Sequence, residues 1–258
     1  MAKVAVRVAD ITVYYDSTPA LKGATIEVEE GSFTGVVGPN GSGKTTLLKA
    51  VAKLLEPSSG AVYVDGRSLR EYSRLELARR LALVPQEHPE GFNLTVADLV
   101  LAGRYPYSPG CWWESWEDER EAMRALDELR LVELSRRRLS ELSGGERQRA
   151  YLARALAQKP KVLLVDEPLA HLDLRYQVEV MKLLRKLADS GVTVIAATHE
   201  VSLAASYCSK LIVLHEGKVA AAGKPREILT PELIKEVYWI EADIIELPGG
   251  QIVIAPKL

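Results

Sequence analysis

A glycine-rich segment near the N-terminus has the spacing of a phosphate-binding loop. The stretch Gly38-Pro39-Asn40-Gly41-Ser42-Gly43-Lys44-Thr45 is a full match to the P-loop pattern. Glycines let the backbone of such a loop curl so that successive N–H groups point at the β- and γ-phosphates. Lys44 adds a positive charge, and the hydroxyl of Thr45 is placed to ligate magnesium. On its own the loop predicts only nucleotide binding, because GTPases, kinases and helicases also carry it.

A second sequence suited to phosphate lies much further along the chain. Leu142-Ser143-Gly144-Gly145-Glu146 directly precedes a helix-forming stretch. The serine offers a hydroxyl and the glycines offer bare N–H groups at a helix N-terminus, where the helix dipole favours an anion. One nucleotide rarely needs two phosphate-binding sequences from the same chain, so the presence of a second one bears directly on function.

A pair of carboxylates follows an apolar strand in the second half of the chain. In Val162-Leu163-Leu164-Val165-Asp166-Glu167, Asp166 ends the strand and is suited to hold magnesium through water. Glu167 comes where the chain leaves the strand, and a carboxylate there can polarise an attacking water as a general base. An acidic turn after a core strand would be the simpler interpretation if the pair stood alone.

Taken together, these motifs resemble those of the ATP-binding cassette family, and the resemblance covers nearly the whole chain. It implies ATP and Mg²⁺ as cofactors. The resemblance assigns ATP contacts to Gly38, Pro39, Asn40, Gly41, Ser42, Gly43, Lys44, Thr45, Thr46, Ser143, Gly144, Gly145, Glu146 and Asp173. It assigns metal binding to Thr45, Gln86 and Asp166, and catalysis to Glu167, His199 and Gln86.

Two further positions are weighed one by one. His199 follows the apolar run 194–198, so it falls at the C-terminal edge of the expected sheet, where ligands of open α/β folds bind. A lone histidine is usually structural, but its place in the motif series favours contact with the γ-phosphate. Tyr15 falls where the family keeps an aromatic residue that stacks on adenine. Tyr14 is its rival, and an aromatic in a strand is otherwise good packing.

Two segments depart from what the family commonly shows or have no assigned role. The D-loop reads Ala170-His171-Leu172-Asp173 where Ser-Ala-Leu-Asp is frequent, and the signature ends in Glu146 where Gln is common. The stretch from Gly110 to Trp116 holds three of the four tryptophans. An anchor for a small helical core is the favoured interpretation, and an apolar edge facing a membrane partner is the alternative.

Composition excludes several classes of protein. A length of 258 residues, with 47% hydrophobic and 26% charged residues, is ordinary for a globular chain with one substantial core. A net charge of −2 gives no electrostatic case for a nucleic-acid partner. Two distant cysteines argue against a disulfide framework. No apolar run approaches the roughly 20 residues of a membrane span, so we expect another chain to cross the membrane if this one acts there.

The order of elements predicts an α/β fold, a P-loop core with a parallel sheet, an N-terminal antiparallel β subdomain and an inserted all-helical subdomain. We expect the core in residues 1–86 and 158–222, the helical subdomain in 87–157, and a C-terminal helix with a β-hairpin in 223–258. The first expected strands are residues 4–8, 11–15, 24–28 and 33–37. A helix over 44–55 and a strand over 61–64 follow, and then a helix over 75–80 and a strand over 81–84. Helices follow at 95–102, 117–131 and 145–157, strands at 162–165, 192–197 and 211–214, and hairpin strands at 240–247 and 251–255.

Local sequence also favours one branch of the family. A single cassette without a membrane segment or coiled-coil arm resembles an importer ATPase subunit, and residues 95–106, 172–181 and 229–232 resemble the branch for iron–siderophore, haem and cobalamin uptake. The alternatives are an ATPase for zinc, manganese, molybdate or tungstate uptake and, less favoured, a soluble cassette ATPase acting on nucleic acid or ribosomes. The resemblance implies a head-to-tail dimer at the cytoplasmic face of the membrane, permease subunits and an extracytoplasmic substrate-binding protein.

Overall fold

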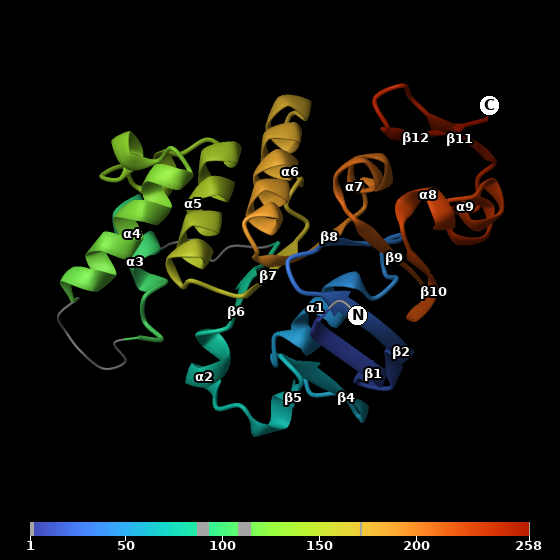
Figure 1. Ribbon diagram of the computed structural model, residues 1–258, viewed down its shortest axis with the longest axis horizontal. Helices are drawn as coiled ribbons and strands as arrows, with labels where there is room; N and C mark the ends of the chain where they lie inside the picture. Colours follow the sequence, from blue (N-terminus) through green and yellow to red (C-terminus); the bar gives the residue numbers. More distant parts are fainter. Residues whose placement is uncertain (1–2, 87–92, 108–114, 171, 258) are drawn as a thin grey trace.

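The computed structural model describes residues 3–86, 93–107, 115–170 and 172–257, which form three β-sheets with helices packed around them (Figure 1). The central sheet has the strand order β10-β9-β3-β8-β7-β6. Neighbours from β9 to β6 are parallel, and β10, a strand not expected from the sequence, pairs antiparallel with β9. The bounds are β3 (Phe33–Val37), β6 (Leu81–Val84), β7 (Val162–Asp166), β8 (Thr193–Thr198), β9 (Lys210–His215) and β10 (Lys218–Gly223).

Two buried apolar cores lie against the central sheet, and its strands contribute to both. In β7, Leu163 and Val165 belong to one core and Val162 and Leu164 to the other, because successive side chains of a strand point to opposite faces. Strands β3, β7 and β8 are buried along their whole length, as parallel strands covered on both faces are. The helices that pack nearby are α1 (Lys44–Val51), α6 (Leu174–Asp189) and α7 (Val201–Tyr207).

The antiparallel β subdomain is a four-stranded sheet in the order β2-β1-β4-β5, below the central sheet in Figure 1. Its strands are β1 (Val4–Tyr15), β2 (Thr18–Glu29), β4 (Ser59–Val64) and β5 (Arg67–Ser68). The expectation of two strands over 4–8 and 11–15 is wrong, since they form one strand. Asp10 has a left-handed φ of 50° and the register with β2 shifts between Val8 and Ile11, so the strand bends there without ending.

The segment between the two halves of the core is helical, as expected. It contains α3 (Val96–Ala102), α4 (Trp116–Glu128) and α5 (Gly144–Ala157), with short 3₁₀ turns η2 (Val132–Leu134) and η3 (Leu139–Glu141). Capping boxes start α3, α4 and α5, which shows why these helices begin where they do. Within the described part of residues 93–157 there is no strand, only an isolated bridge from Thr95 to Arg138.

A buried ion pair holds these three helices together. The Arg104 Nε lies 2.9 Å from the Asp118 Oδ1, and both side chains are almost wholly buried. Arg104 also donates a hydrogen bond of 2.8 Å to the carbonyl oxygen of Ala157. The end of α3, the first turn of α4 and the end of α5 are therefore tied to one guanidinium group.

The remaining elements are short. They are η1 (Leu69–Glu71), α2 (Arg74–Ala78), α8 (Pro225–Ile228), α9 (Pro231–Tyr238), β11 (Ala242–Glu246) and β12 (Ile252–Pro256). Strands β11 and β12 pair antiparallel, which confirms the expected C-terminal hairpin. The helices expected over 44–55 and 117–131 end earlier, at Val51 and Glu128, where Lys53 and Arg130 turn into the left-handed region.

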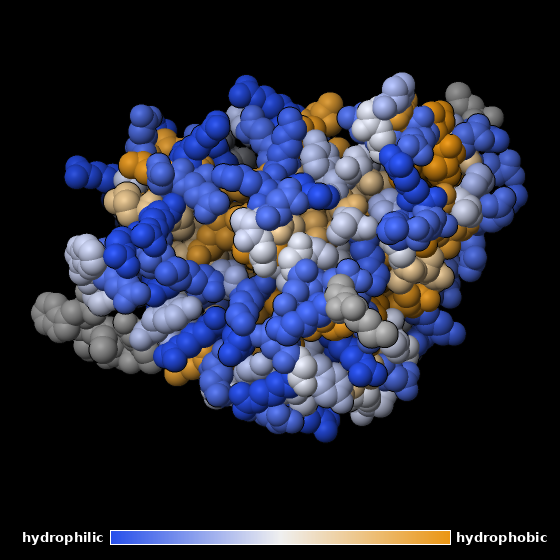
Figure 2. All heavy atoms as spheres, viewed as in Figure 1, coloured by the Kyte–Doolittle hydropathy of each residue, from blue (hydrophilic) through white to orange (hydrophobic). Residues whose placement is uncertain are grey.

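The surface in Figure 2 is mostly polar, with small apolar patches on the side of the C-terminal hairpin. Exposed apolar side chains of that region include Ile245 and Leu247. Among the described residues, every helix is too short or too polar to span a bilayer.

Candidate functional site

A cavity of about 870 Å³ opens at the C-terminal edge of the central sheet. The carboxyl ends of neighbouring parallel strands meet there, so loops that are distant in sequence converge on one place. The predicted residues in its wall are Tyr15, Gly38, Pro39, Asn40, Gly41, Gly43, Lys44, Thr45, Thr46, Gln86, Glu167 and His199. The structure thus brings together most of the predicted nucleotide-binding residues.

The phosphate-binding loop connects β3 to α1 and needs glycine at its two ends. Gly43, which caps α1, has a φ of 103°, a conformation that other residues rarely adopt. A Cβ added at Gly38 would lie 2.1 Å from the carbonyl oxygen of Leu214, so the loop lies too close to β9 for a side chain. The loop is therefore fixed by contact with the sheet, and α1 directs its N-terminus, with the positive end of its dipole, at the cavity.

Lys44 lies at the first position of α1 and is buried. Its ammonium donates hydrogen bonds of 2.8 Å and 3.1 Å to the carbonyl oxygens of Gly38 and Pro39, so the side chain is held against the start of the loop. Burial lowers the pKa of Lys44, while the carboxylates of Glu167 and Asp166 oppose that shift. A cation held in this way can stabilise phosphate oxygens at the loop.

Thr45 and Asp166 form a pair of oxygen donors beside Lys44. The hydroxyl of Thr45 donates to the Oδ1 of Asp166 at 3.1 Å, and burial raises the pKa of the Asp166 carboxyl. Hydroxyl and carboxylate oxygens suit a hard cation such as Mg²⁺. No cluster of three or more His, Cys, Asp or Glu with metal-site geometry occurs among the described residues. The hydroxyl of Thr45 and the carboxylate of Asp166 would supply two ligands to a magnesium ion, whose usual remaining ligands are phosphate oxygens and water.

Glu167 and His199 form the second polar cluster in the cavity wall. The Oε2 of Glu167 lies 2.8 Å from the Nδ1 of His199, and its Oε1 lies 3.9 Å from the Lys44 ammonium. The backbone of Glu167 has a left-handed φ of 47° and its N–H donates to Ala197 at 2.9 Å. The turn after β7 therefore directs this buried carboxylate along the sheet edge, between a histidine and a phosphate-binding lysine, where it can accept a proton from water.

The structure distinguishes the two candidate aromatic residues. Both side chains are exposed, but Tyr15, at the end of β1, lines the cavity and Tyr14 does not. Side chains alternate along a strand, so only one of the two can face the cavity. Gln86, two residues beyond the end of β6, lies in the wall as expected.

The signature residues 143–146 lie outside this cavity. Ser143 caps α5, and its hydroxyl lies 2.8 Å from the Oε2 of Glu146, which also accepts the Ser143 N–H at 2.9 Å. That N–H is the largest cause of the lowered pKa of Glu146. Glutamate therefore completes the capping box at the position where glutamine is common in the family. Within one chain, the two phosphate-binding sequences do not meet.

The D-loop and the tryptophan-rich stretch are only partly described. Asp173 is the N-cap of α6, exposed and outside the cavity wall, while His171 lies outside the described residues. Of residues 110–116, only Ser115 and Trp116 are described. Trp116 is 73% exposed, with the Arg120 guanidinium 4.9 Å from its ring centroid. The interpretation of this stretch as a core anchor is therefore wrong for Trp116, which lies at the surface at the start of α4.

Some residues in the cavity wall were not expected from the sequence. Gln177, one turn into α6, lines the cavity and has its side-chain amide 3.4 Å from the carbonyl oxygen of Leu169. Thr18 and Pro19 reach the wall from the start of β2, where Thr18 pairs with the cavity-lining Tyr15 across the hairpin. Tyr238, at the end of α9, also lines it. No local motif marks these positions, since tertiary packing alone places them.

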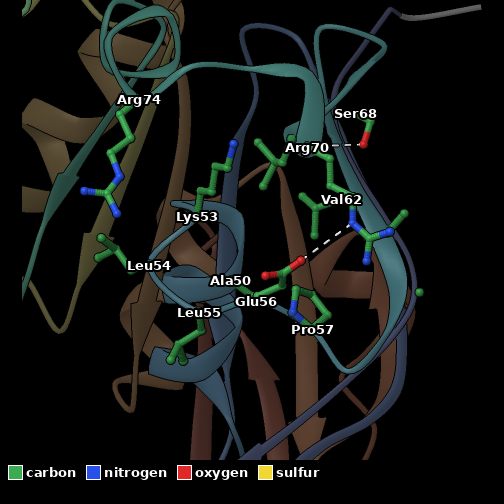
Figure 3. A pocket seen from close by; sticks show the side chains of 13 residues that line it. Ala50, Lys53, Leu54, Leu55, Glu56, Pro57, Val62, Ser68, Arg70 and Arg74 are labelled. Atoms are coloured by element: carbon green, nitrogen blue, oxygen red, sulfur yellow. Dashed lines mark hydrogen bonds and ion pairs between the residues drawn. The ribbon is translucent and has the colours of Figure 1, made fainter.

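A second hollow, of about 400 Å³, lies between the end of α1, β4 and η1 (Figure 3). Lys53 at its edge donates a 2.6 Å hydrogen bond to the carbonyl oxygen of Tyr72, and the Arg70 guanidinium lies 3.8 Å from the Glu56 carboxylate. These charges are already engaged with the protein, and none of the phosphate-binding motifs borders the hollow. The phosphate-binding loop thus lies at the larger cavity at the sheet edge and not at this hollow.

Comparison with known proteins gives a consistent answer. The model of the family described as ABC transporter matches residues 21–170. The ferric enterobactin transport ATP-binding protein FepC of Escherichia coli (strain K12) is 38% identical over 92% of this chain and 88% of its own. The hemin import ATP-binding protein HmuV of Rhodococcus jostii (strain RHA1) is 37% identical over 98% of this chain and 87% of its own.

Solved structures agree in fold. A chain from an inward-facing ABC transporter assigned to the metal-chelate type superposes with a TM-score of 0.87 at 29% identity, over 99% of this chain and 98% of that one. A dimeric post-hydrolysis state of the ATP-binding cassette MJ0796, bound to ADP and Pi, gives a TM-score of 0.75 at 30% identity, over 86% of this chain and 99% of that one.

Proposed function

The chain belongs to the ABC transporter family, and from this premise we propose that it is the ATP-hydrolysing subunit of an importer for an iron chelate, with haem or cobalamin as the related cargoes. The cassette binds ATP, and its relatives FepC and HmuV are named for transport of ferric enterobactin and import of hemin. The similar metal-chelate transporter chain supports the same class of cargo.

In this proposal the cavity at the sheet edge holds the nucleotide. Tyr15 stacks on adenine, the loop from Gly38 to Thr46 wraps the phosphates, and Thr45, Asp166 and Gln86 bind Mg²⁺. Glu167 accepts a proton from the attacking water, while His199 orients Glu167 through their 2.8 Å contact and reaches the γ-phosphate. Mg²⁺, when bound, neutralises charge that develops on the phosphates.

The observation that carries the mechanism is the separation of the two phosphate-binding sequences. Residues 143–146 stand at an exposed helix N-terminus and are absent from the wall that holds Lys44. We infer a head-to-tail dimer in which Ser143, Gly144, Gly145 and Glu146 of one protomer, together with Asp173, complete the site of its partner. The related cassette MJ0796 has a dimeric structure, which supports the formation of a dimer. ATP then closes the dimer because it binds the closed state more tightly, and hydrolysis reopens it.

A mixed dimer tests whether sites are shared. One chain carries Lys44→Ala and the other Ser143→Arg, and both carry Glu167→Gln so that trapped ATP is not hydrolysed. If the signature acts across the interface, both defects fall in one site and the other stays intact, so tagged mixed dimers should trap about one ATP. If it acts within its own chain, every site has a defect, and mixed dimers would trap no more nucleotide than either homodimer. That second result would refute the shared-site mechanism.

Transport requires partners, and we propose permease subunits, an extracytoplasmic substrate-binding protein and attachment at the cytoplasmic face of the membrane. The ATPase rate of the purified chain should rise when it is reconstituted with its permease and a binding protein loaded with an iron chelate. Stimulation by a zinc-, manganese-, molybdate- or tungstate-loaded binding protein would instead place the chain in the alternative branch. Stimulation by nucleic acid or ribosomes alone would overturn the importer assignment.

A further inference from the structure

Tyr238 brings the C-terminal segment into contact with the nucleotide cavity. It is the last residue of α9, and among the described residues beyond β10 it is the one that lines the cavity. The next residue, Trp239, has a left-handed φ of 59° and packs edge-on against His215, with ring centroids 5.4 Å apart. The C-terminal helix therefore ends against the strand that supports the phosphate-binding loop.

The same region is joined to the phosphate-binding loop through the backbone. His215 ends β9, and two residues later the N–H of Gly217 donates to the carbonyl oxygen of Ser42 at 3.1 Å. The carbonyl oxygen of Leu214 lies directly against Gly38. The end of β9 and the turn after it thus contact the loop at Gly38 and at Ser42, and Trp239, the residue that follows α9, packs against the last residue of β9. A displacement of α9 would therefore alter the contacts that hold the phosphate-binding loop.

The hydroxyl of Tyr238 is buried and has no hydrogen-bond partner among the described residues. Burial also raises the pKa of this phenol well above its usual value, so the group remains a protonated donor at physiological pH. A buried hydroxyl without an acceptor is unfavourable, and the great majority of such groups in folded proteins are paired. Because Tyr238 forms part of the cavity wall, a rotation that turned its hydroxyl toward the cavity would let a bound ligand supply the missing acceptor.

We propose that Tyr238 is a nucleotide-binding residue, whose hydroxyl donates a hydrogen bond to a phosphate oxygen of bound ATP. The proposal rests on the assignment of the cavity to the nucleotide. A triphosphate carries anionic oxygen acceptors, which the Tyr238 hydroxyl lacks among the described residues, and charged acceptors form the stronger hydrogen bonds.

Tyr238→Phe tests the proposal, because it removes the hydroxyl and keeps the ring. Two effects of opposite sign are expected in the full-length protein with Glu167→Gln, which prevents hydrolysis. Without nucleotide, the variant should melt about 2–4 °C higher, since an unpaired buried group has been removed. With Mg²⁺ and ATP, its Kd for ATP should rise about tenfold, the size expected for loss of a hydrogen bond to a charged acceptor.

Tyr72→Phe is the matched control. The hydroxyl of Tyr72 is buried too, but it donates to the carbonyl oxygen of Val64 at 3.1 Å and lies outside the cavity wall. This variant should melt lower and bind ATP with unchanged affinity. Lys44→Ala tests the cavity itself, because loss of binding in that variant supports the assignment of the site whatever Tyr238 does. If Tyr238→Phe binds ATP as tightly as the parent while Lys44→Ala does not bind, the role of Tyr238 is refuted and the nucleotide site stands.

Discussion

Replacement of Glu167 by glutamine separates the binding of ATP from its hydrolysis. The amide keeps the shape of the side chain and can keep the contact with His199, so the fold should not change. An amide cannot accept the proton of the attacking water. Loss of a positioned general base slows a reaction by about 10²–10⁴-fold, equivalent to about 3–5 kcal/mol of activation free energy.

The structure also predicts the direction in which the affinity for ATP changes in the Glu167→Gln variant. The Glu167 carboxylate lies 3.9 Å from the Lys44 ammonium, with both side chains buried. Coulomb attraction at that separation is about 1 kcal/mol even with the screening of bulk water, and larger in a buried site. Because this attraction competes with the phosphates for the same ammonium group, Glu167→Gln should bind ATP at least about fivefold more tightly.

The assay is single-turnover release of phosphate together with equilibrium binding of ATP and Mg²⁺. Glu200→Gln is the matched control, since the partly exposed Glu200 carboxylate lies 3.4 Å from the other nitrogen of His199. Its turnover should stay within about threefold of the parent, because it does not line the cavity. A decrease in turnover of less than tenfold for Glu167→Gln, or an equal decrease for Glu200→Gln, would show that Glu167 is not the base.

Four further variants test separate parts of the structure. Tyr15→Ala should weaken ATP binding by about tenfold or more, the contribution expected from stacking on one base. Tyr14→Ala should change the affinity for ATP by less than about twofold. Equal losses of affinity in a fluorescence titration of the two variants would reject Tyr15 as the adenine contact. Lys44→Ala should abolish measurable ATP binding by calorimetry, and near-normal turnover would contradict the role of the loop. Arg104→Met removes the guanidinium that pairs with the buried Asp118 carboxylate and should lower the free energy of unfolding by about 3–5 kcal/mol in urea titrations. A loss below about 1 kcal/mol would mean that the pair does not hold the helices together.

Much of the fold could be predicted because its strands are short apolar runs between strong turn signals. Strands β3 and β6 have the expected ends, since Gly31 and the loop at Gly38 bound the first and a proline follows the second. Strand β10 is not predicted because Lys218–Gly223 is rich in alanine, which favours a helix. The segment forms a strand because it pairs with β9. The division into a core over 1–86 and 158–222, a helical subdomain over 87–157 and a tail over 223–258 stays a prediction.

The parts of the site that are formed by consecutive residues could be predicted from the sequence. The loop at Lys44 and the pair Asp166 and Glu167 follow strands whose ends meet at one sheet edge, so the motif and its location are specified together. Gln177 and Tyr238 have no such signal, because their place in the wall depends on how α6 and α9 pack. The exposure of Trp116 was missed for the same reason, since apolar character alone does not decide which side of a helix is buried.

The left-handed backbone of Glu167 links the chemistry of the site to the stability of the fold. A residue with a side chain costs on the order of 1 kcal/mol or more in this conformation, whereas glycine adopts it freely. Selection for stability alone would therefore favour glycine at position 167, and selection for turnover favours the carboxylate. The proposed base thus lies where the chain gives up folding free energy for activity, and screens for thermostable variants should recover inactive substitutions at this residue.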